Sequence, residues 1–152
     1  MKRLKNFSVG EIQVRYRPRK VYSPVTITCS KDSYNLVKEF FNKNTVALQE
    51  QFVVMYLNQA NKVLGFYCIS YGGITATVAD IRIILAVAVT TASVKIIVAH
   101  NHPSGNLSPS AYDKELTKRL KESASLMEIK LLDHLIIIPS GQYTSMADEG
   151  FM

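Results

Sequence analysis

The segment that most constrains the fold is the run KIIVA at residues 95–99, which is short and almost continuously apolar. A strand with one face in water alternates apolar and polar residues, whereas a strand buried on both faces is apolar throughout. This run therefore predicts a central strand in a sheet that is covered on both faces. Such a sheet needs helices on its two sides, so we expect an α/β domain.

The other periodicities predict further helices and strands around this segment. Apolar residues at helical spacing predict helices at residues 31–42, after an N-cap at Ser30, and at 108–126. The apolar run at residues 76–92 has the β-branched content of a strand, but its length without a turn signal favours a buried helix. The helix at residues 108–126 is expected to have Pro109 at its first helical position. Alternating and apolar runs predict two antiparallel hairpins, at residues 51–57 with 63–70 and at 129–139 with 143–145. Together these elements indicate a mixed sheet between helices.

The chain has 152 residues, a length that suits one compact domain. No apolar stretch approaches the ~20 residues that a membrane-spanning helix needs. The basic N-terminus lacks the apolar segment and small-residue cleavage site of a secretory signal. Cys29 and Cys68 lack CxxC spacing, so we interpret them as mostly buried thiols in a reducing compartment. We therefore expect a soluble cytoplasmic protein with no membrane partner.

Basic residues are concentrated at the N-terminus, where seven of the 18 lysines and arginines lie in the first 20 positions. Residues 11–17 alternate polar and apolar side chains and predict a strand at a sheet edge. Neighbours in a strand point to opposite faces, so Arg15, Arg17 and Arg19 would share one face. That stripe fits contact with nucleic-acid phosphates or an acidic partner. It also fits a solvated edge strand that its charges protect from aggregation.

Two of the three histidines follow the central strand. His100 and His102 are two residues apart, so their imidazoles can point to the same side. The loop after them can bring Asp113, in the first turn of the next helix, back to the strand end. Two histidines and one carboxylate, with a fourth position for water, are the ligand set of a catalytic zinc site. Each residue also has an ordinary explanation, because a buried histidine is often a core residue and Asp113 suits the first turn of a helix that Ser110 caps.

A water molecule activated by a metal needs a proton acceptor when it attacks a substrate. Glu50 immediately precedes the predicted strand at residues 51–57, and it is the only acid between Glu39 and Asp80. If that strand lies beside residues 95–99, Glu50 can reach the metal and act as the general base. The alternative is an exposed acid at the start of a strand, and the sequence leaves both interpretations open.

The stretch HNHPSG, which begins at His100, is followed by Ser110 and Asp113 at the spacing His-x-His, seven residues, Ser, two residues, Asp. This pattern resembles the signature of the RadC-like branch of the JAMM (MPN/JAB-type) metalloprotease superfamily. Glu50 before an apolar strand matches the upstream glutamate of that signature. The C-terminal stretch LLDHLIIIPSGQYTSMADEG resembles the hairpin of the family. The resemblance extends from about residue 30 to the C-terminus.

The resemblance implies that residues 30–152 form a JAB/MPN domain, a three-layer α-β-α fold of the cytidine-deaminase-like type, and that residues 1–29 are a basic extension with the edge strand. It implies a zinc-dependent hydrolase of peptide or isopeptide (amide) bonds. His100, His102 and Asp113 then hold Zn²⁺. Glu50 moves the proton of the attacking water to the leaving nitrogen, and Ser110 donates a hydrogen bond to the oxyanion. The substrate is a protein or peptide.

The main alternative is a non-catalytic scaffold, or a DNA-associated binding module, of the same fold. The DNA-repair label of the family is historical, and a basic extension stands here where longer members carry a helix-hairpin-helix-type region. Zinc deaminases fit less well, because their H-x-E and P-C-x-x-C elements are absent. His134 belongs to the Leu-Asp-His stretch of the resemblance, where it can orient a ligand by a hydrogen bond from behind. A structural hydrogen bond is the preferred interpretation, and His134 is placed outside the ligand set. The sequence does not define the oligomeric state.

Overall fold

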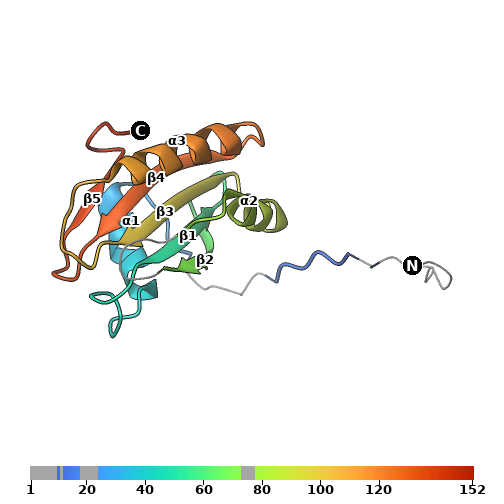
Figure 1. Cartoon of the computed structure of the whole chain (residues 1–152). Helices are drawn as coiled ribbons and strands as arrows, with labels where there is room; N and C mark the ends of the chain where they lie inside the picture. The colour runs from blue at the N-terminus through green and yellow to red at the C-terminus, as the bar shows by residue number, and fades with distance from the viewer. Residues whose placement is uncertain (1–9, 11, 18–23, 73–77) are drawn as a thin grey trace.

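The computed structural model describes residues 10, 12–17, 24–72 and 78–152 (Figure 1). Within these residues the centre is a five-stranded sheet with the order β2-β1-β3-β4-β5. β1 (Gln51–Leu57) pairs antiparallel with both β2 (Val63–Tyr71) and β3 (Lys95–Asn101). β3 runs parallel to β4 (Lys130–Ile137), and β4 pairs antiparallel with β5 (Tyr143–Ser145). The sheet is mixed, and β3 is its central strand, as the run at residues 95–99 predicted.

Helices cover both faces of this sheet. α2 (Ile81–Thr90) and α3 (Ala111–Ser125) pack on one face, and α1 (Ser30–Val37) packs on the other (Figure 1). The fold is therefore a three-layer α-β-α arrangement, which confirms the predicted α/β class with a mixed sheet. Within the described part of the chain, no helix is both long enough and apolar enough to cross a bilayer.

The alternation of side chains along β1 explains why both helical layers are needed. Phe52 and Val54 join the core beneath α2 and α3, whereas Val53 and Met55 join the core beneath α1. Full burial of such a side chain stabilises the fold by about 1.5–3 kcal/mol. A helix missing from either face would expose a row of these side chains, so the sheet specifies both layers.

Side-chain caps set the starts of α2 and α3, and both starts correct the sequence predictions. α2 begins after Asp80, whose carboxylate accepts a hydrogen bond from Arg82 N; residues 78–80 are not helical, and residues 76–77 lie outside the described residues. α3 begins after Ser110, so Pro109 precedes the N-cap and is not the first helical residue. Ser110 and Asp113 form a reciprocal capping box, which fixes the side chain of a predicted metal ligand.

α1 is shorter than its predicted range of residues 31–42. Its N-cap is Cys29, without a side-chain cap, so the prediction of Ser30 as the N-cap is wrong. The helix ends at Val37 and continues as a single 3₁₀ turn, η1 (Lys38–Phe40). The turn ends because Phe41 adopts an extended backbone and buries its ring in the core. Cys29 is exposed, and Cys68 is half-buried, so the prediction of mostly buried thiols is also wrong.

The predicted edge strand at residues 11–17 is not formed, because residues 12–17 belong to no strand and are exposed. An alternating pattern becomes a strand only when another strand pairs with it. Among the described residues the first β-bridge along the chain is an isolated one, between Thr26 and Lys62, just before β2. Arg15 and Arg17 are therefore exposed outside any strand, and Arg19 lies outside the described residues. The division of the chain at residue 30 remains a prediction.

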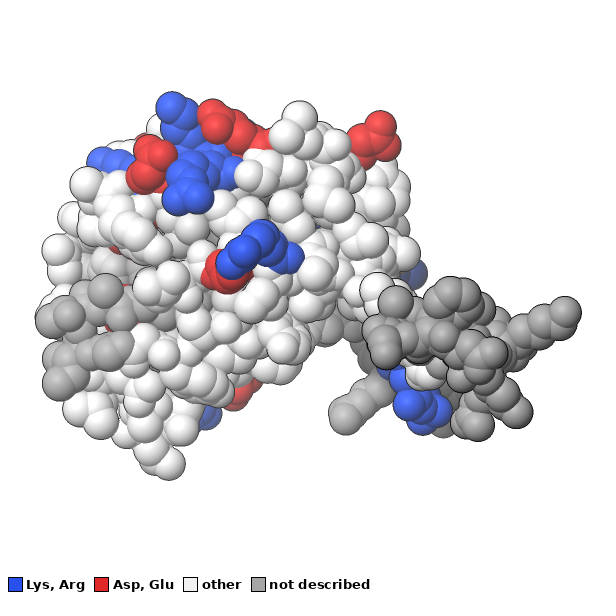
Figure 2. Space-filling view, turned by 45° about the vertical axis from the view of Figure 1, so that its right-hand side comes forward, with Lys and Arg blue, Asp and Glu red and all other residues white. Residues whose placement is uncertain are grey.

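The charge distribution on the face shown in Figure 2 is mixed. Lysine and arginine side chains gather near the top of that view, at the level of α3, and acidic side chains lie among them. α3 itself carries both signs along its length, in the sequence AYDKELTKRLKESAS. This face of the domain therefore presents no continuous basic surface.

Candidate metal centre

The C-terminal end of β3 directs its two histidines toward the start of α3. His100 is buried and lies in register between Phe52 of β1 and Ile136 of β4. His102 follows the strand directly, and its backbone N–H donates to Ile137 O at 2.8 Å. The pleat of the strand therefore places both imidazoles on the α3 side.

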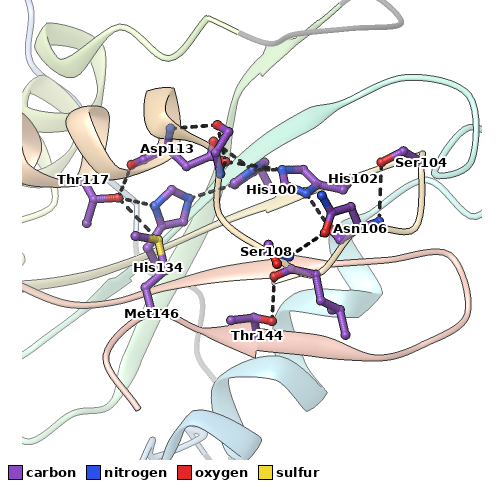
Figure 3. Close-up of polar contacts among 12 residues, drawn as sticks. His100, His102, Ser104, Asn106, Ser108, Asp113, Thr117, His134, Thr144 and Met146 are labelled. Atoms are coloured by element: carbon purple, nitrogen blue, oxygen red, sulfur yellow. Dashed lines mark hydrogen bonds and ion pairs between the residues drawn. The ribbon is translucent and has the colours of Figure 1, made fainter. Parts of the chain in front are cut away.

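Asp113, in the first turn of α3, meets both imidazoles (Figure 3). Its Oδ1 lies 3.2 Å from His100 Nε2, and its Oδ2 lies 3.5 Å from His102 Nε2. The two Nε2 atoms are 2.9 Å apart, and the ligand atoms of the three residues all lie within 4.8 Å of one another. Two imidazole nitrogens and a carboxylate are the donors of a zinc site with an open position. The residues present therefore fit a divalent metal.

A hydrogen bond behind the His102 ring determines which nitrogen faces the cluster. His102 Nδ1 lies 2.7 Å from the carbonyl oxygen of Asn106. A carbonyl oxygen only accepts, so Nδ1 carries a proton, and Nε2 is the ring nitrogen that faces Asp113 and can bind a metal. The side chain of Asn106 accepts in turn from Ser108 N at 2.9 Å, which holds the loop in place. Metal-binding histidines are commonly oriented in this way, by a carbonyl on the second ring nitrogen.

The electrostatics of the cluster favour a cation. The contact with Asp113 raises the pKa of His102 above its ordinary value, and the Asn106 carbonyl and the charge of Glu50 add to this rise, while burial opposes it. Burial raises the pKa of the Asp113 carboxyl, but the contacts with His100 and His102 outweigh burial and hold that pKa well below its ordinary value. Asp113 is therefore an anion at neutral pH, and the three groups attract positive charge to the space between them.

Ser110 uses its hydroxyl to orient Asp113. The Ser110 hydroxyl and backbone N–H each donate to Asp113 Oδ2 at 2.7 Å. Asp113 N–H donates back to Ser110 Oγ at 3.1 Å. The predicted role of Ser110 as an oxyanion donor requires this O–H to turn from Asp113 toward a substrate. That role remains a prediction.

A cleft of about 300 Å³ opens over the cluster. Its lining includes Glu50, His100, His102, Ser110 and Asp113. The structure therefore brings together in one cavity the three candidate ligands, the candidate base and the candidate oxyanion donor. Glu50 is half-buried and directly precedes β1, as the sequence placed it.

Asn101 holds the chain on both sides of Glu50. Its Oδ1 accepts from Gln51 N at 2.7 Å. Its Nδ2 donates to the carbonyl oxygens of Val46 and Gln49, at 2.7 and 3.0 Å. Asn101 is fully buried, and these bonds tie β3 to the segment that leads into β1. This role was not predicted from the sequence, although an amide side chain between two histidines at the end of a predicted strand was a usable signal.

A second group of polar residues lies behind His100 (Figure 3). His134 Nε2 lies 2.8 Å from His100 Nδ1, and His134 Nδ1 lies 2.6 Å from Thr117 Oγ1. His134 contacts His100 from β4 and is not one of the three clustered ligands. Thr117 was not predicted from the sequence. Its position four residues after Asp113, on the same face of α3, was the available signal.

Fold and site together define a class of protein: an α-β-α domain that can hold a metal at the end of its central strand. Comparison with known families leads to the same class, because residues 27–151 match the family described as the RadC-like JAB domain. The chain belongs to the RadC-like JAB domain family, as the resemblance in its sequence indicated.

Relatives with curated sequences carry the name UPF0758 protein. The chain is 36% identical to the one from Flavobacterium johnsoniae over 140 residues, which covers 92% of this chain and 59% of that relative. It is 42% identical to the one from Porphyromonas gingivalis over 127 residues, which covers 84% of this chain and 55% of that relative. The chain spans between half and two thirds of the length of these relatives, and their names state no activity.

Proposed function

We propose that the chain is a zinc-dependent hydrolase of peptide or isopeptide bonds that acts on a protein or peptide. The observation that carries this proposal is the convergence of His100, His102 and Asp113 in a cleft that Glu50 also lines. A structural zinc site uses four protein ligands, whereas a catalytic site keeps one position open. Within the described residues the cluster offers three ligands and faces a cleft, which supports a catalytic site.

Zinc is the metal that this donor set favours, because imidazole nitrogen and carboxylate oxygen are both common zinc ligands. When bound, zinc supplies Lewis-acid polarisation of the scissile carbonyl and lowers the pKa of a water molecule to about 7. His102 is oriented for binding by the Asn106 carbonyl, and Asp113 is oriented by Ser110. The loop and the helix start therefore hold these two ligands before a metal arrives.

Glu50 acts as the proton carrier in this proposal. It accepts the proton of the attacking water and delivers it to the leaving nitrogen of the amide. Glu50 lines the same cleft as the candidate ligands and is not one of the clustered ligands, so its carboxylate is available for this role. General acid–base catalysis of this kind contributes about 10²–10⁴ to a rate. Asn101 fixes the residues on both sides of Glu50 and so limits where the carboxylate can lie.

Ser110 acts as the oxyanion donor in this proposal. Its hydroxyl turns from Asp113 Oδ2 to the oxygen of the tetrahedral intermediate. Asp113 Oδ2 then keeps its hydrogen bond from the Ser110 backbone N–H, so the carboxylate stays oriented. A preorganised donor at this position contributes about 10²–10³ to the rate.

The proposal is tested by measuring zinc content and hydrolysis on the same protein. Emission spectrometry is expected to find about one zinc per chain in the wild type. In His102→Ala the zinc content is expected to be close to zero. A library of quenched fluorescent peptides and isopeptide-linked peptides is expected to be cleaved by the zinc-loaded wild type alone. Stoichiometric zinc in His102→Ala would refute the ligand set. A zinc-loaded wild type that cleaves nothing would favour the non-catalytic scaffold.

A second candidate function is weak association with nucleic acid through Arg15, Arg17 and Arg19. It is supported by the exposure of Arg15 and Arg17. Binding to phosphates releases counterions, so affinity for a labelled DNA duplex is expected to fall steeply with salt and with neutralisation of these arginines. Fluorescence anisotropy measures this affinity. Binding that is absent or independent of salt would exclude this candidate.

A further inference from the structure

We propose that Tyr112 determines which substrates the cleft accepts. With Pro109 and Leu116 it forms an apolar wall of the cleft, and this wall receives a large apolar side chain of the substrate next to the scissile bond. All three residues line the cleft that contains the candidate ligands. The inference rests on the proposed function and deepens it, because it names the kind of side chain that the substrate carries.

The apolar wall belongs to the start of α3. Leu116 follows Tyr112 by four residues, so the two side chains are neighbours on the surface of the helix. Leu116 is 5% exposed and is packed in the core beneath α2 and α3, which holds its side chain in place. The first turn of α3 carries both Tyr112 and the candidate ligand Asp113. A substrate side chain on this wall therefore lies close to the bond at the metal site.

Tyr112 has apolar surface that a substrate can cover. Its side chain lines the cleft, yet the residue is 50% exposed. Contact with an apolar side chain removes this surface from water, which is favourable in proportion to the area buried. The cleft has a volume of about 300 Å³, so it admits a short extended segment of a chain and excludes a folded domain.

The loop before α3 forms a polar part of the same lining. Ser104, Asn106 and Ser108 line the cleft and are exposed. Their hydroxyl and amide groups can pair with the backbone of a peptide, as the few polar groups of a ligand pocket commonly do. A bound peptide therefore has polar partners for its backbone on the loop and an apolar surface for one side chain on α3.

The charges of the cleft favour an uncharged side chain on the apolar wall. Among the described residues, the lining contains the acids Glu50 and Asp113 and neither lysine nor arginine. A divalent metal ion offsets these two formal charges, so the cleft has no excess of either sign to attract a charged group. A charged side chain of the substrate would lose hydration on the wall without gaining a partner. Large apolar side chains gain most from this surface.

NMR titration of the ¹⁵N-labelled, zinc-free full chain tests the preference without cleavage of the probe. The probes are blocked peptides, Ac-Gly-Ser-X-Ser-Gly-NH₂, in which X is Phe, Leu, Ala, Asp or Lys. The Phe and Leu peptides are expected to bind about tenfold more tightly than the Ala peptide, and the Asp and Lys peptides no more tightly than Ala. The amide signals of Tyr112 and Leu116 are expected to shift. Equal affinity for all of these peptides, or no binding of any of them, would overturn the inference.

Tyr112→Ala is the decisive substitution, and Tyr112→Phe is its matched control. The preference for the Phe peptide over the Ala peptide is expected to fall by about threefold or more in Tyr112→Ala. It is expected to persist in Tyr112→Phe, which keeps the ring, and in Lys118→Ala, an exposed change on the same helix outside the lining. The melting temperature of Tyr112→Ala is expected to stay near the wild-type value, because the residue is half exposed and alanine favours a helix. An unchanged preference in Tyr112→Ala would refute the role of Tyr112.

Hydrolysis of the same peptides separates this inference from the proposed function. In the zinc-loaded wild type, kcat/KM is expected to follow the order of the affinities. Cleavage with equal kcat/KM for the Phe and Ala peptides would defeat the apolar wall and leave the hydrolase standing. The expected binding preference in a protein that cleaves none of the peptides would defeat the hydrolase and leave the wall as a binding site.

Discussion

The inner and outer halves of the site are built differently. The inner half, which we define as His100, His134 and Thr117, is buried, and its side chains are joined by contacts of 2.6 and 2.8 Å. The outer half, which we define as Glu50 and Ser110, lines the cleft; Glu50 is half-buried and Ser110 is exposed. The core therefore fixes the geometry of the candidate ligand His100, while the groups proposed to move protons line the open cleft and can turn.

The largest expected effect comes from Glu50→Gln, which alters the outer half alone. Hydrolysis is expected to fall about 10²–10⁴-fold, because glutamine cannot accept and return the proton. Zinc content is expected to stay near one per chain, because Glu50 is not in the ligand cluster. Steady-state kinetics and emission spectrometry on one preparation check both parts. Glu39→Gln, at an exposed acid of η1, is the control. An active Glu50→Gln would remove Glu50 from the mechanism.

Substitution of Ser110 separates its two roles. Ser110→Ala is expected to lower hydrolysis about 10²–10³-fold through loss of the oxyanion donor. It is also expected to cost about 1 kcal/mol of stability through loss of the cap, whereas Ser110→Gly costs only a few tenths. Hydrolysis and thermal unfolding are measured for both variants. If the Ser110 hydroxyl is an oxyanion donor, Ser110→Ala and Ser110→Gly lose activity to the same extent, although they differ in stability. If the loss of activity is instead larger in the less stable variant, the hydroxyl acts only as a helix cap.

A smaller effect is expected from Asn101→Asp, which acts on the connection between the two halves. The carboxylate of aspartate cannot donate to the carbonyl oxygens of Val46 and Gln49, so the segment around Glu50 loses two bonds. Each buried group left without a partner costs about 1–3 kcal/mol. We expect lower stability and a fall in kcat of up to about 10²-fold from misplacement of Glu50, with zinc content unchanged. Wild-type kcat in a folded Asn101→Asp would show that these bonds do not position the base.

The smallest expected effect is the pH dependence of zinc affinity. A proton and zinc compete for His102 Nε2, and the contact with Asp113 raises the pKa of His102 above its ordinary value of 6.5. The affinity for zinc therefore has its full value above the raised pKa of His102, and it falls by about tenfold per pH unit below that pKa. Chelator competition over a pH series measures this fall. An onset at or below the ordinary histidine pKa would contradict the assigned cause.

The sequence predicted the parts of this molecule that depend on local pattern. The continuous apolar character of residues 95–99 predicted the central strand, and the two-residue spacing of His100 and His102 predicted that their imidazoles point to one side. These succeeded because two residues of separation on a strand determine a common face, whatever the rest of the fold does. The alternation failed at residues 12–17 because, within the described part of the chain, these residues pair with no strand, and pairing is not a local property.

The residues behind the ligands could not be predicted from local pattern. His134 meets His100 only because β4 runs parallel to β3 in one register, with His134 opposite Val98. Thr117 meets His134 only because α3 packs over that pair of strands. Sequence spacing places Thr117 on the face of α3 that carries Asp113, but it does not show that His134 lies against that face. The contacts of the inner half are therefore visible only in three dimensions.

The most direct test of the central claim is zinc K-edge X-ray absorption of the zinc-loaded wild type. Binding by His100, His102 and Asp113 predicts two imidazole nitrogens at about 2.0–2.1 Å, a carboxylate oxygen at about 2.0–2.2 Å and one further light atom. A spectrum with one imidazole, or with a sulfur at about 2.3 Å from a cysteine, would contradict the claim.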